Sequence, residues 1–151
     1  MSPQELPRIL FLCSGNYYRS RFAEELFNHW AMAQGASYRA DSAGLWPSCQ
    51  THNVGPMSPF TIRGLQERGV SLPASLRAPR DVTEDDLRTS MLTIAVKELE
   101  HRPLVQSRFP AWAGRVEFWH VDDVGDAPPS VALPLLERGV SELLARLAGL
   151  R

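Results

Sequence analysis

Residues 8 to 20 have the sequence Arg8-Ile9-Leu10-Phe11-Leu12-Cys13-Ser14-Gly15-Asn16-Tyr17-Tyr18-Arg19-Ser20, which joins an apolar run, a polar turn and a helix start. The run from Arg8 to Leu12 predicts a short buried strand. The cluster Ser14-Gly15-Asn16 predicts a tight loop. Ser20 is a candidate cap for a helix that Gly35 would end. A strand, a tight loop and a helix in this order open a parallel α/β domain.

The remainder of the chain continues this alternation of strands and helices. We expect a short acidic segment capped by Thr83, strands at 37–42, 91–96 and 116–121, and helices at 56–68, 97–106 and 130–148. No internal repeat, low-complexity segment or linker interrupts the pattern, so we expect a single domain over residues 1–151.

Composition and charge narrow the class of protein. The chain has 151 residues, of which 44% are hydrophobic and 22% charged, and its formal net charge is −1. These values are typical of a globular domain and give no reason to expect attraction to nucleic acid or to an anionic membrane. The sequence contains neither a secretory signal nor an apolar run long enough to span a bilayer. We therefore expect a cytoplasmic protein.

The cysteines and histidines do not suggest a metal site or a disulfide framework. The only cysteines are Cys13 and Cys49, and the four histidines are scattered along the chain without metal-ligand spacing. The sequence therefore predicts no metal and no cofactor.

The chemistry concentrates at Cys13, which follows the first predicted strand. Open α/β sheets bind ligands at this end of their strands, and a helix beginning near Ser20 would direct its positive end there. Gly15 allows the loop to curl with its N–H groups inward, and Arg19 can hold two phosphate oxygens. Such donors also stabilise the nucleophilic thiolate, so the pattern favours covalent phosphoryl transfer. The alternative is a buried small Cys13 with Arg19 as a surface charge, because Cys-x5-Arg alone is a weak signal.

The segment from Leu10 to Ser20 resembles the low-molecular-weight protein tyrosine phosphatase signature, a hydrophobic strand followed by C-x-G-N-x-x-R-S. Asp41-Ser42-Ala43-Gly44 is similar to the family's Ser-Ala-Gly segment, and Arg80 and Thr83 fall where the family has an Ala-Arg stretch. The resemblance covers nearly the whole chain. It implies a three-layer α/β sandwich whose four-stranded parallel sheet has the order 2-1-3-4, flanked by helices.

The resemblance also implies residue roles. Cys13 would form a phosphocysteine, Asn16 would hold the loop through Ser42, and Ser20 would donate a hydrogen bond to the Cys13 sulfur. Arg19 and the loop amides would stabilise the transferred phosphoryl group. The phosphate-binding residues are then Ser14, Gly15, Asn16, Tyr17, Tyr18, Arg19 and Ser20.

The general acid is expected just after the fourth strand, where the chain has Asp122-Asp123. We favour Asp123, because related bacterial sequences place the acid four residues after an aromatic residue such as Trp119. Asp122 is the alternative. Strand alternation would turn the two carboxylates in opposite directions, so they are not interchangeable.

Several positions depart from the family pattern. No Pro or aromatic residue follows the Asp pair, so Tyr17 and Trp46 become the candidates for the substrate wall. Tyr18 stands where many members have a second, protective cysteine, and an approach of Cys49 to Cys13 is a less favoured substitute. Lys97 stands where some members have an acid that braces the loop arginine. Either Glu98 compensates or the brace is absent.

The sequence therefore predicts a phosphatase for phosphomonoesters, with protein phosphotyrosine favoured and inorganic phosphate as product. The partner would be a phosphorylated protein or a small phosphate ester, and phosphoarginine is a further option that the Tyr17-Tyr18 pair disfavours. One alternative is an arsenate reductase on the same fold, although this chain has no further cysteines for a thiol relay. The other is an inactive phosphate-binding module.

Overall fold

A computed structural model describes residues 5–46 and 53–149 of the chain. Within these residues four strands form one parallel sheet in the order β2-β1-β3-β4, which confirms the expected topology. In the central pairings Cys13 lies opposite Gly44, and Leu12 lies opposite Ala95. The strands are β1 (Arg8–Cys13), β2 (Arg39–Gly44), β3 (Leu92–Ala95) and β4 (Val116–Phe118).

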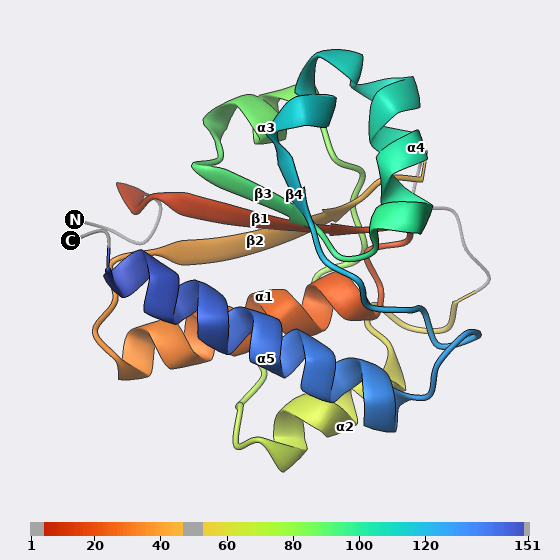
Figure 1. Cartoon of the computed structure of the whole chain (residues 1–151). Helices are drawn as coiled ribbons and strands as arrows, with labels where there is room; N and C mark the ends of the chain where they lie inside the picture. Colours follow the sequence, from red (N-terminus) through yellow and green to blue (C-terminus); the bar gives the residue numbers. More distant parts are fainter. Residues whose placement is uncertain (1–4, 47–52, 150–151) are drawn as a thin grey trace.

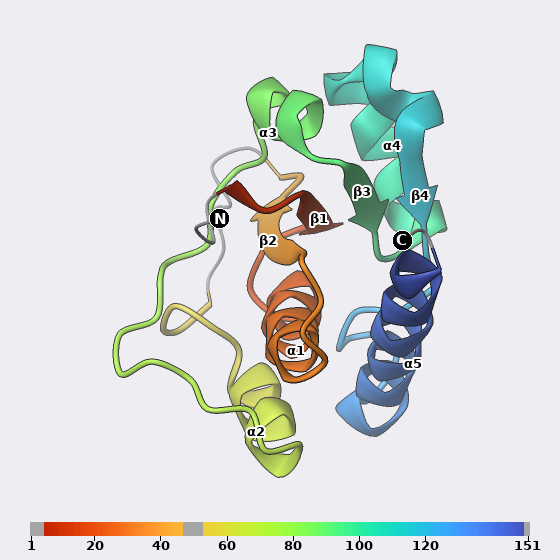
Figure 2. The same ribbon diagram turned by 90° about the vertical axis from the view of Figure 1, so that its left-hand side faces the viewer.

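Helices cover both faces of the sheet, giving three layers (Figure 1). One face carries α1, α2 and α5, and the other carries α3 and α4, as the turned view in Figure 2 also shows. The helices are α1 (Arg19–Ala33), α2 (Pro59–Glu67), α3 (Glu84–Thr89), α4 (Glu98–Arg108), the 3₁₀ segment η3 (Pro110–Arg115) and α5 (Pro129–Ala148).

The helix starts agree only in part with the sequence signals. Thr83 caps α3 as expected, because its side chain accepts from the Asp86 N–H while the Asp86 carboxylate accepts from the Thr83 N–H. The prediction that Ser20 caps α1 is wrong. The N-cap is Tyr18, two residues earlier, and that cap makes no side-chain hydrogen bond. The Ser20 hydroxyl lies instead beside the Cys13 sulfur.

The strands also shift slightly from their expected bounds. The fourth strand ends at Phe118 rather than at Val121, because the chain turns there toward α4. His120 then forms an isolated antiparallel bridge with Lys97. The Val121 N–H still donates to the carbonyl oxygen of Val96, at 2.7 Å. This path brings the Asp122-Asp123 segment to the same edge of the sheet as Cys13.

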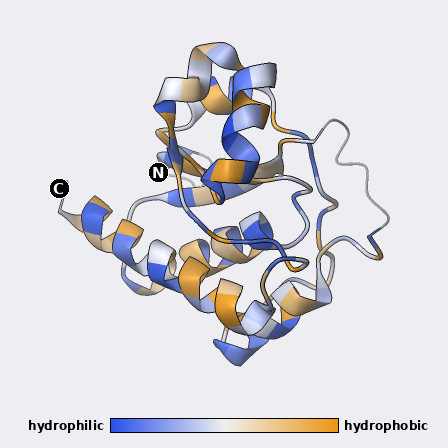
Figure 3. Cartoon of the chain, turned by 45° about the vertical axis from the view of Figure 1, so that its right-hand side comes forward, coloured by the Kyte–Doolittle hydropathy of each residue, from blue (hydrophilic) through white to orange (hydrophobic). Residues whose placement is uncertain are grey.

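The side chains of β1 alternate between two apolar cores. Ile9, Phe11 and Cys13 pack on the α1 and α5 side, whereas Leu10 and Leu12 pack on the α4 side. The α5 residues expected to be buried are indeed buried: Leu136, Val140, Leu143, Leu144 and Leu147. Figure 3 shows the matching alternation of hydrophobic and hydrophilic bands along α5. Burial on both faces explains why β1 consists almost entirely of apolar residues.

In the described part of the chain no helix is both long enough and apolar enough to cross a membrane.

Candidate active site

The Cys13–Arg19 loop connects the end of β1 to the start of α1. Its sulfur atom is buried and lies 2.9 Å from the hydroxyl oxygen of Ser20. Asn16 adopts a left-handed backbone conformation with φ of 51°, which asparagine tolerates better than most residues. Its side-chain amide donates to the hydroxyls of Ser20 and Ser42, each at 2.9 Å. The Asn16–Ser42 contact is therefore present at the place where the resemblance implied it.

Arg77 supports the back of this loop, a role that the sequence did not indicate. Its guanidinium donates to Oδ1 of Asn16 and to the hydroxyl of Ser42, both at 2.9 Å. It also forms an ion pair with the Glu24 carboxylate at 3.0 Å. Burial raises the pKa of Glu24, and the positive charge of Arg77 opposes that rise. These contacts anchor Asn16 from a segment that lies 61 residues further along the chain.

Arg19 is buried beneath the loop, with 1% of its surface exposed. Its Nη1 and Nη2 donate to Oε1 and Oε2 of Glu100, at 3.1 and 2.7 Å, and Nη1 also donates to the carbonyl oxygen of Val121 at 2.9 Å. The Nε–H group is buried and has no hydrogen-bond partner in the described part of the chain. The guanidinium thus retains one unpaired donor, the Nε–H.

Glu100 supplies the brace for the loop arginine, so both expectations for that brace were wrong. Lys97 forms an ion pair with Asp122, and the Glu98 carboxylate accepts from Arg102 within the same helix. Glu100 lies further along the first turn of α4 and faces Arg19 directly. The sequence contained a signal for this brace, since Glu100 lies within one helical turn of Lys97. It did not indicate which acid would face the loop.

Glu100 is held in turn by Ser14 and by His101. The Ser14 hydroxyl donates to Oε2 of Glu100, and Nε2 of His101 lies 3.0 Å from the same oxygen. Burial would raise the pKa of Glu100, but the hydrogen bonds from His101, Arg19 and Ser14 outweigh it and hold this pKa well below its ordinary range. These contacts therefore favour the ionised form of Glu100.

The two candidate acids have different surroundings. Oδ2 of Asp123 lies 3.8 Å from Nη2 of Arg19, and Asp123 lines the same cavity as Cys13. The Asp122 carboxylate instead contacts the Nζ of Lys97 at 2.7 Å, and Asp122 does not line that cavity. The structure therefore brings Asp123, and not Asp122, to the Cys13 cavity.

The cavity has a volume of about 510 Å³ and aromatic walls. Tyr17 and Trp46, the expected wall residues, both line it, and Trp46 is 43% exposed. The Tyr17 hydroxyl donates to the carbonyl oxygen of Val54 at 2.6 Å, which fixes the tilt of that ring. Phe60, at the start of α2, forms a further wall that the sequence did not indicate. Cys49 lies outside the described residues.

Tyr18 also lines this cavity. Its ring packs edge-on against that of Phe60, with 6.4 Å between the ring centres. The side chain is 5% exposed, and its hydroxyl has no hydrogen-bond partner among the described residues. Burial, followed by the negative charge of Asp123 and opposed by Arg19, raises the pKa of Tyr18 to about 12. The phenol is therefore a neutral group in the cavity wall.

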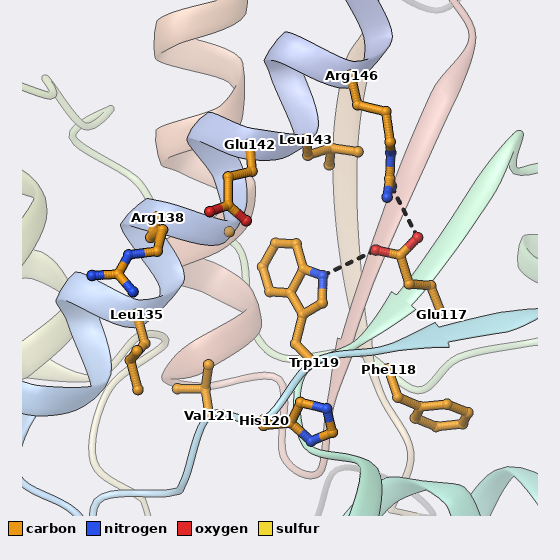
Figure 4. A pocket seen from close by; sticks show the side chains of 11 residues that line it. Glu117, Phe118, Trp119, His120, Val121, Leu135, Arg138, Glu142, Leu143 and Arg146 are labelled. Carbon is orange, nitrogen blue, oxygen red and sulfur yellow. Dashed lines mark hydrogen bonds and ion pairs between the residues drawn. The ribbon is translucent and has the colours of Figure 1, made fainter.

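A second cavity of about 500 Å³ lies between β4 and α5, and no residue of the Cys13–Arg19 loop lines it (Figure 4). Trp119 lies at its centre, and its indole N–H donates to the Glu117 carboxylate at 3.1 Å. Glu117 also pairs with Arg146 at 2.9 Å. Across residues 5–46 and 53–149, no three histidine, cysteine, aspartate or glutamate side chains are grouped to hold a metal ion.

The comparisons with known proteins agree with this geometry. The family model described as low molecular weight phosphotyrosine protein phosphatase matches residues 8–123. A protein-arginine-phosphatase of Bacillus subtilis (strain 168) is 28% identical over 108 residues, which are 72% of this chain and 67% of that protein.

Two solved structures illustrate the likeness in fold. A low molecular weight protein tyrosine phosphatase from T. tengcongensis has 27% identity and a TM-score of 0.73, over 96% of this chain and 99% of that one. YfkJ from Bacillus subtilis has a TM-score of 0.80 at 24% identity, over 97% and 98% of the two chains, which shows a shared fold. Since the family model spans the sheet from β1 to the Asp122-Asp123 segment, the chain belongs to the low molecular weight phosphotyrosine protein phosphatase family and is a phosphatase.

Proposed function

We propose that this phosphatase hydrolyses phosphomonoesters through a phosphocysteine intermediate on Cys13. The observation that carries the proposal is the buried guanidinium of Arg19, whose Nε–H has no partner among the described residues although it lies beside the Cys13 cavity. An unpaired buried donor is costly, and a phosphate oxygen would satisfy it. The positive N-terminal end of α1 adds to the attraction for an anion.

In the first step the Cys13 thiolate attacks phosphorus, and the bond between phosphorus and the leaving oxygen breaks. Asp123, protonated, gives its proton to that oxygen. Arg19 and the loop N–H groups hold the non-bridging oxygens as charge redistributes. The role of Asp123 is supported by its place in the Cys13 cavity, whereas Asp122 is occupied by Lys97.

In the second step a water molecule attacks the phosphocysteine, and Asp123 takes the proton of that water. The bond between sulfur and phosphorus breaks, which releases inorganic phosphate and returns the thiolate. The Ser20 hydroxyl lies 2.9 Å from the sulfur and can donate a hydrogen bond to the departing thiolate. This contact supports the role that the resemblance gave to Ser20.

We further propose protein phosphotyrosine as the preferred substrate. The aromatic rings of Tyr17, Trp46 and Phe60 offer flat apolar walls on which a phenyl ring can pack. A second candidate is protein phosphoarginine, which the name of the Bacillus subtilis relative favours. The Tyr17-Tyr18 pair argues for the first candidate, because it lines the cavity with bulky side chains.

The test compares the hydrolysis of p-nitrophenyl phosphate, a phosphotyrosine peptide and a phosphoarginine peptide by the wild type. Activity lost in Cys13→Ser and strongly reduced in Asp123→Ala supports the mechanism. Absence of any turnover by the wild type would contradict it and leave an inactive phosphate-binding module or an arsenate reductase. If Asp122→Ala loses activity and Asp123→Ala retains it, the acid is Asp122. A higher kcat/KM for the phosphoarginine peptide would overturn the phosphotyrosine preference.

A further inference from the structure

The contact between Arg19 and Glu100 uses one particular edge of the guanidinium. A guanidinium has an end edge, formed by Nη1 and Nη2, and a side edge, formed by Nε and Nη2. Glu100 accepts from Nη1 and Nη2 and therefore occupies the end edge. The side edge includes the Nε–H that has no partner among the described residues. A planar fork held in this way presents two parallel donors to an oxyanion.

Glu100 also joins Arg19 to the opposite side of the Cys13–Arg19 loop. The Ser14 hydroxyl donates to the carboxylate oxygen that Nη2 of Arg19 contacts. Ser14 directly follows Cys13, so one carboxylate ties together the first and last parts of the loop. Glu100 itself does not line the Cys13 cavity, which means that it acts through these two residues.

His101 fixes the Glu100 carboxylate from behind. The backbone N–H of Lys97 donates to Nδ1 of His101 at 3.0 Å, so Nδ1 is the acceptor and Nε2 carries the proton. That Nε2–H faces Oε2 of Glu100 at 3.0 Å and the Ser14 hydroxyl at 3.1 Å. The His101 side chain is fully buried, and this burial lowers its pKa against the opposing effect of Glu100. His101 therefore remains a neutral donor in a single tautomer.

We propose that Glu100 and His101 are positioning residues that orient the side edge of Arg19 and the Ser14 end of the loop for phosphate. Neither residue would contact the substrate. The inference rests on the proposed binding of phosphate by Arg19. It assigns to α4 a supporting role that the position of Lys97 cannot fill, since that side chain is positive and pairs with Asp122.

The first variant is Glu100→Gln, which keeps the size of the side chain but removes one of the two acceptor oxygens. The matched control is Glu98→Gln, because Glu98 lies in the same helix turn and its carboxylate contacts Arg102. We expect Glu100→Gln to weaken the binding of inorganic phosphate, measured by titration calorimetry, by about tenfold or more, as loss of a charge-assisted bidentate contact implies. The KM for p-nitrophenyl phosphate should rise by a similar factor, and the control should match the wild type.

A pair of variants tests His101. In Asn the side-chain oxygen takes the place of Nδ1, whereas in Gln the side-chain amide nitrogen takes the place of Nε2. His101→Gln should therefore retain more phosphate affinity than His101→Asn, because only Gln can still donate to Glu100. Equal losses in the two variants would remove His101 from the proposal.

The binding measurement separates this inference from the proposed function. If the wild type binds phosphate but hydrolyses nothing, the proposed function fails, and the binding data for Glu100→Gln still decide the positioning role. If Glu100→Gln lowers the melting temperature but leaves phosphate affinity and KM unchanged, Glu100 is only structural and the inference is overturned. If the wild type itself binds no phosphate, both proposals fail.

Discussion

Replacing Tyr18 with phenylalanine removes a single oxygen atom that is buried in the cavity wall without a hydrogen-bond partner among the described residues. The ring keeps its place in the apolar core and its edge-on contact with Phe60. A buried hydroxyl without a partner costs about 1–3 kcal/mol of folding free energy. We therefore expect Tyr18→Phe to raise the free energy of unfolding by about 1 kcal/mol, which corresponds to roughly 2–4 °C in melting temperature for a domain of this size.

The gain in unfolding free energy from Tyr18→Phe should also increase with pH in the alkaline range. The pKa of Tyr18 is raised to about 12 in the folded protein, above its ordinary value of 10.0. As pH rises from about 10 to about 12, the unfolded chain loses the phenol proton while the folded chain keeps it, so the wild type loses stability. Tyr18→Phe lacks this loss, and its advantage over the wild type should widen in that range.

The measurement is urea denaturation of both proteins at pH 7, with Tyr17→Phe as the matched control. The Tyr17 hydroxyl donates to the Val54 carbonyl oxygen, so its removal should leave stability unchanged or reduce it. A Tyr18→Phe protein that is less stable than the wild type would refute the reasoning, because the hydroxyl would then have a partner that stabilises the fold.

Three further predictions concern other parts of the chain. Gly139→Ala should destabilise the protein by about 1 kcal/mol, although alanine has the better helix propensity. The reason is that the new Cβ would lie 2.7 Å from the Trp119 ring. Thermal melting checks this, with Gly114→Ala as the control because a Cβ there would meet nothing within 4 Å. Ser20→Ala should lower kcat about tenfold or more and enlarge the p-nitrophenol burst, because the second step loses the hydrogen-bond donor to the leaving sulfur. An unchanged kcat would exclude Ser20 as that donor. Burial would raise the pKa of Asp86, but hydrogen bonds and the charge of Arg80 lower it. The stabilisation by the ionised Asp86 is therefore present above about pH 4 and lost at lower pH. Asp86→Asn should lower the free energy of unfolding by about 1–2 kcal/mol at pH 7, and by progressively less as the pH falls. Urea denaturation measures this difference, and a difference that stays constant with pH would contradict the prediction.

The features that the sequence predicted well are those that depend on neighbouring residues along the chain. The capping box from Thr83 to Asp86, the apolar strand β1 and the buried face of α5 each follow from residue types at fixed local spacings. The order of the loop from Cys13 to Arg19 belongs to the same class. Local backbone preferences and periodic burial act over a few residues, so the chain itself carries this information.

Even local signals failed where a tertiary contact competed with them. The Ser20 hydroxyl was expected to cap α1, but it lies between the Cys13 sulfur and the Asn16 amide. The fourth strand was expected to continue to Val121, but it ends where the chain turns toward α4. In the first case contacts within the site replaced the capping interaction, and in the second the bridge between His120 and Lys97 replaced the continued strand.

The sequence by itself determined the Cys13–Arg19 loop, the α/β alternation that places it at a sheet edge, and the pair of acids near it. The sequence favoured Asp123 and left Asp122 as the alternative, but only the tertiary structure showed that Asp123 lines the cavity and that Glu100 braces Arg19. Successive residues of a helix are turned by about 100° from one another. Which acid at the start of α4 faces the loop therefore depends on how that helix packs on the sheet, and contacts spanning 81 residues cannot be read from local spacing.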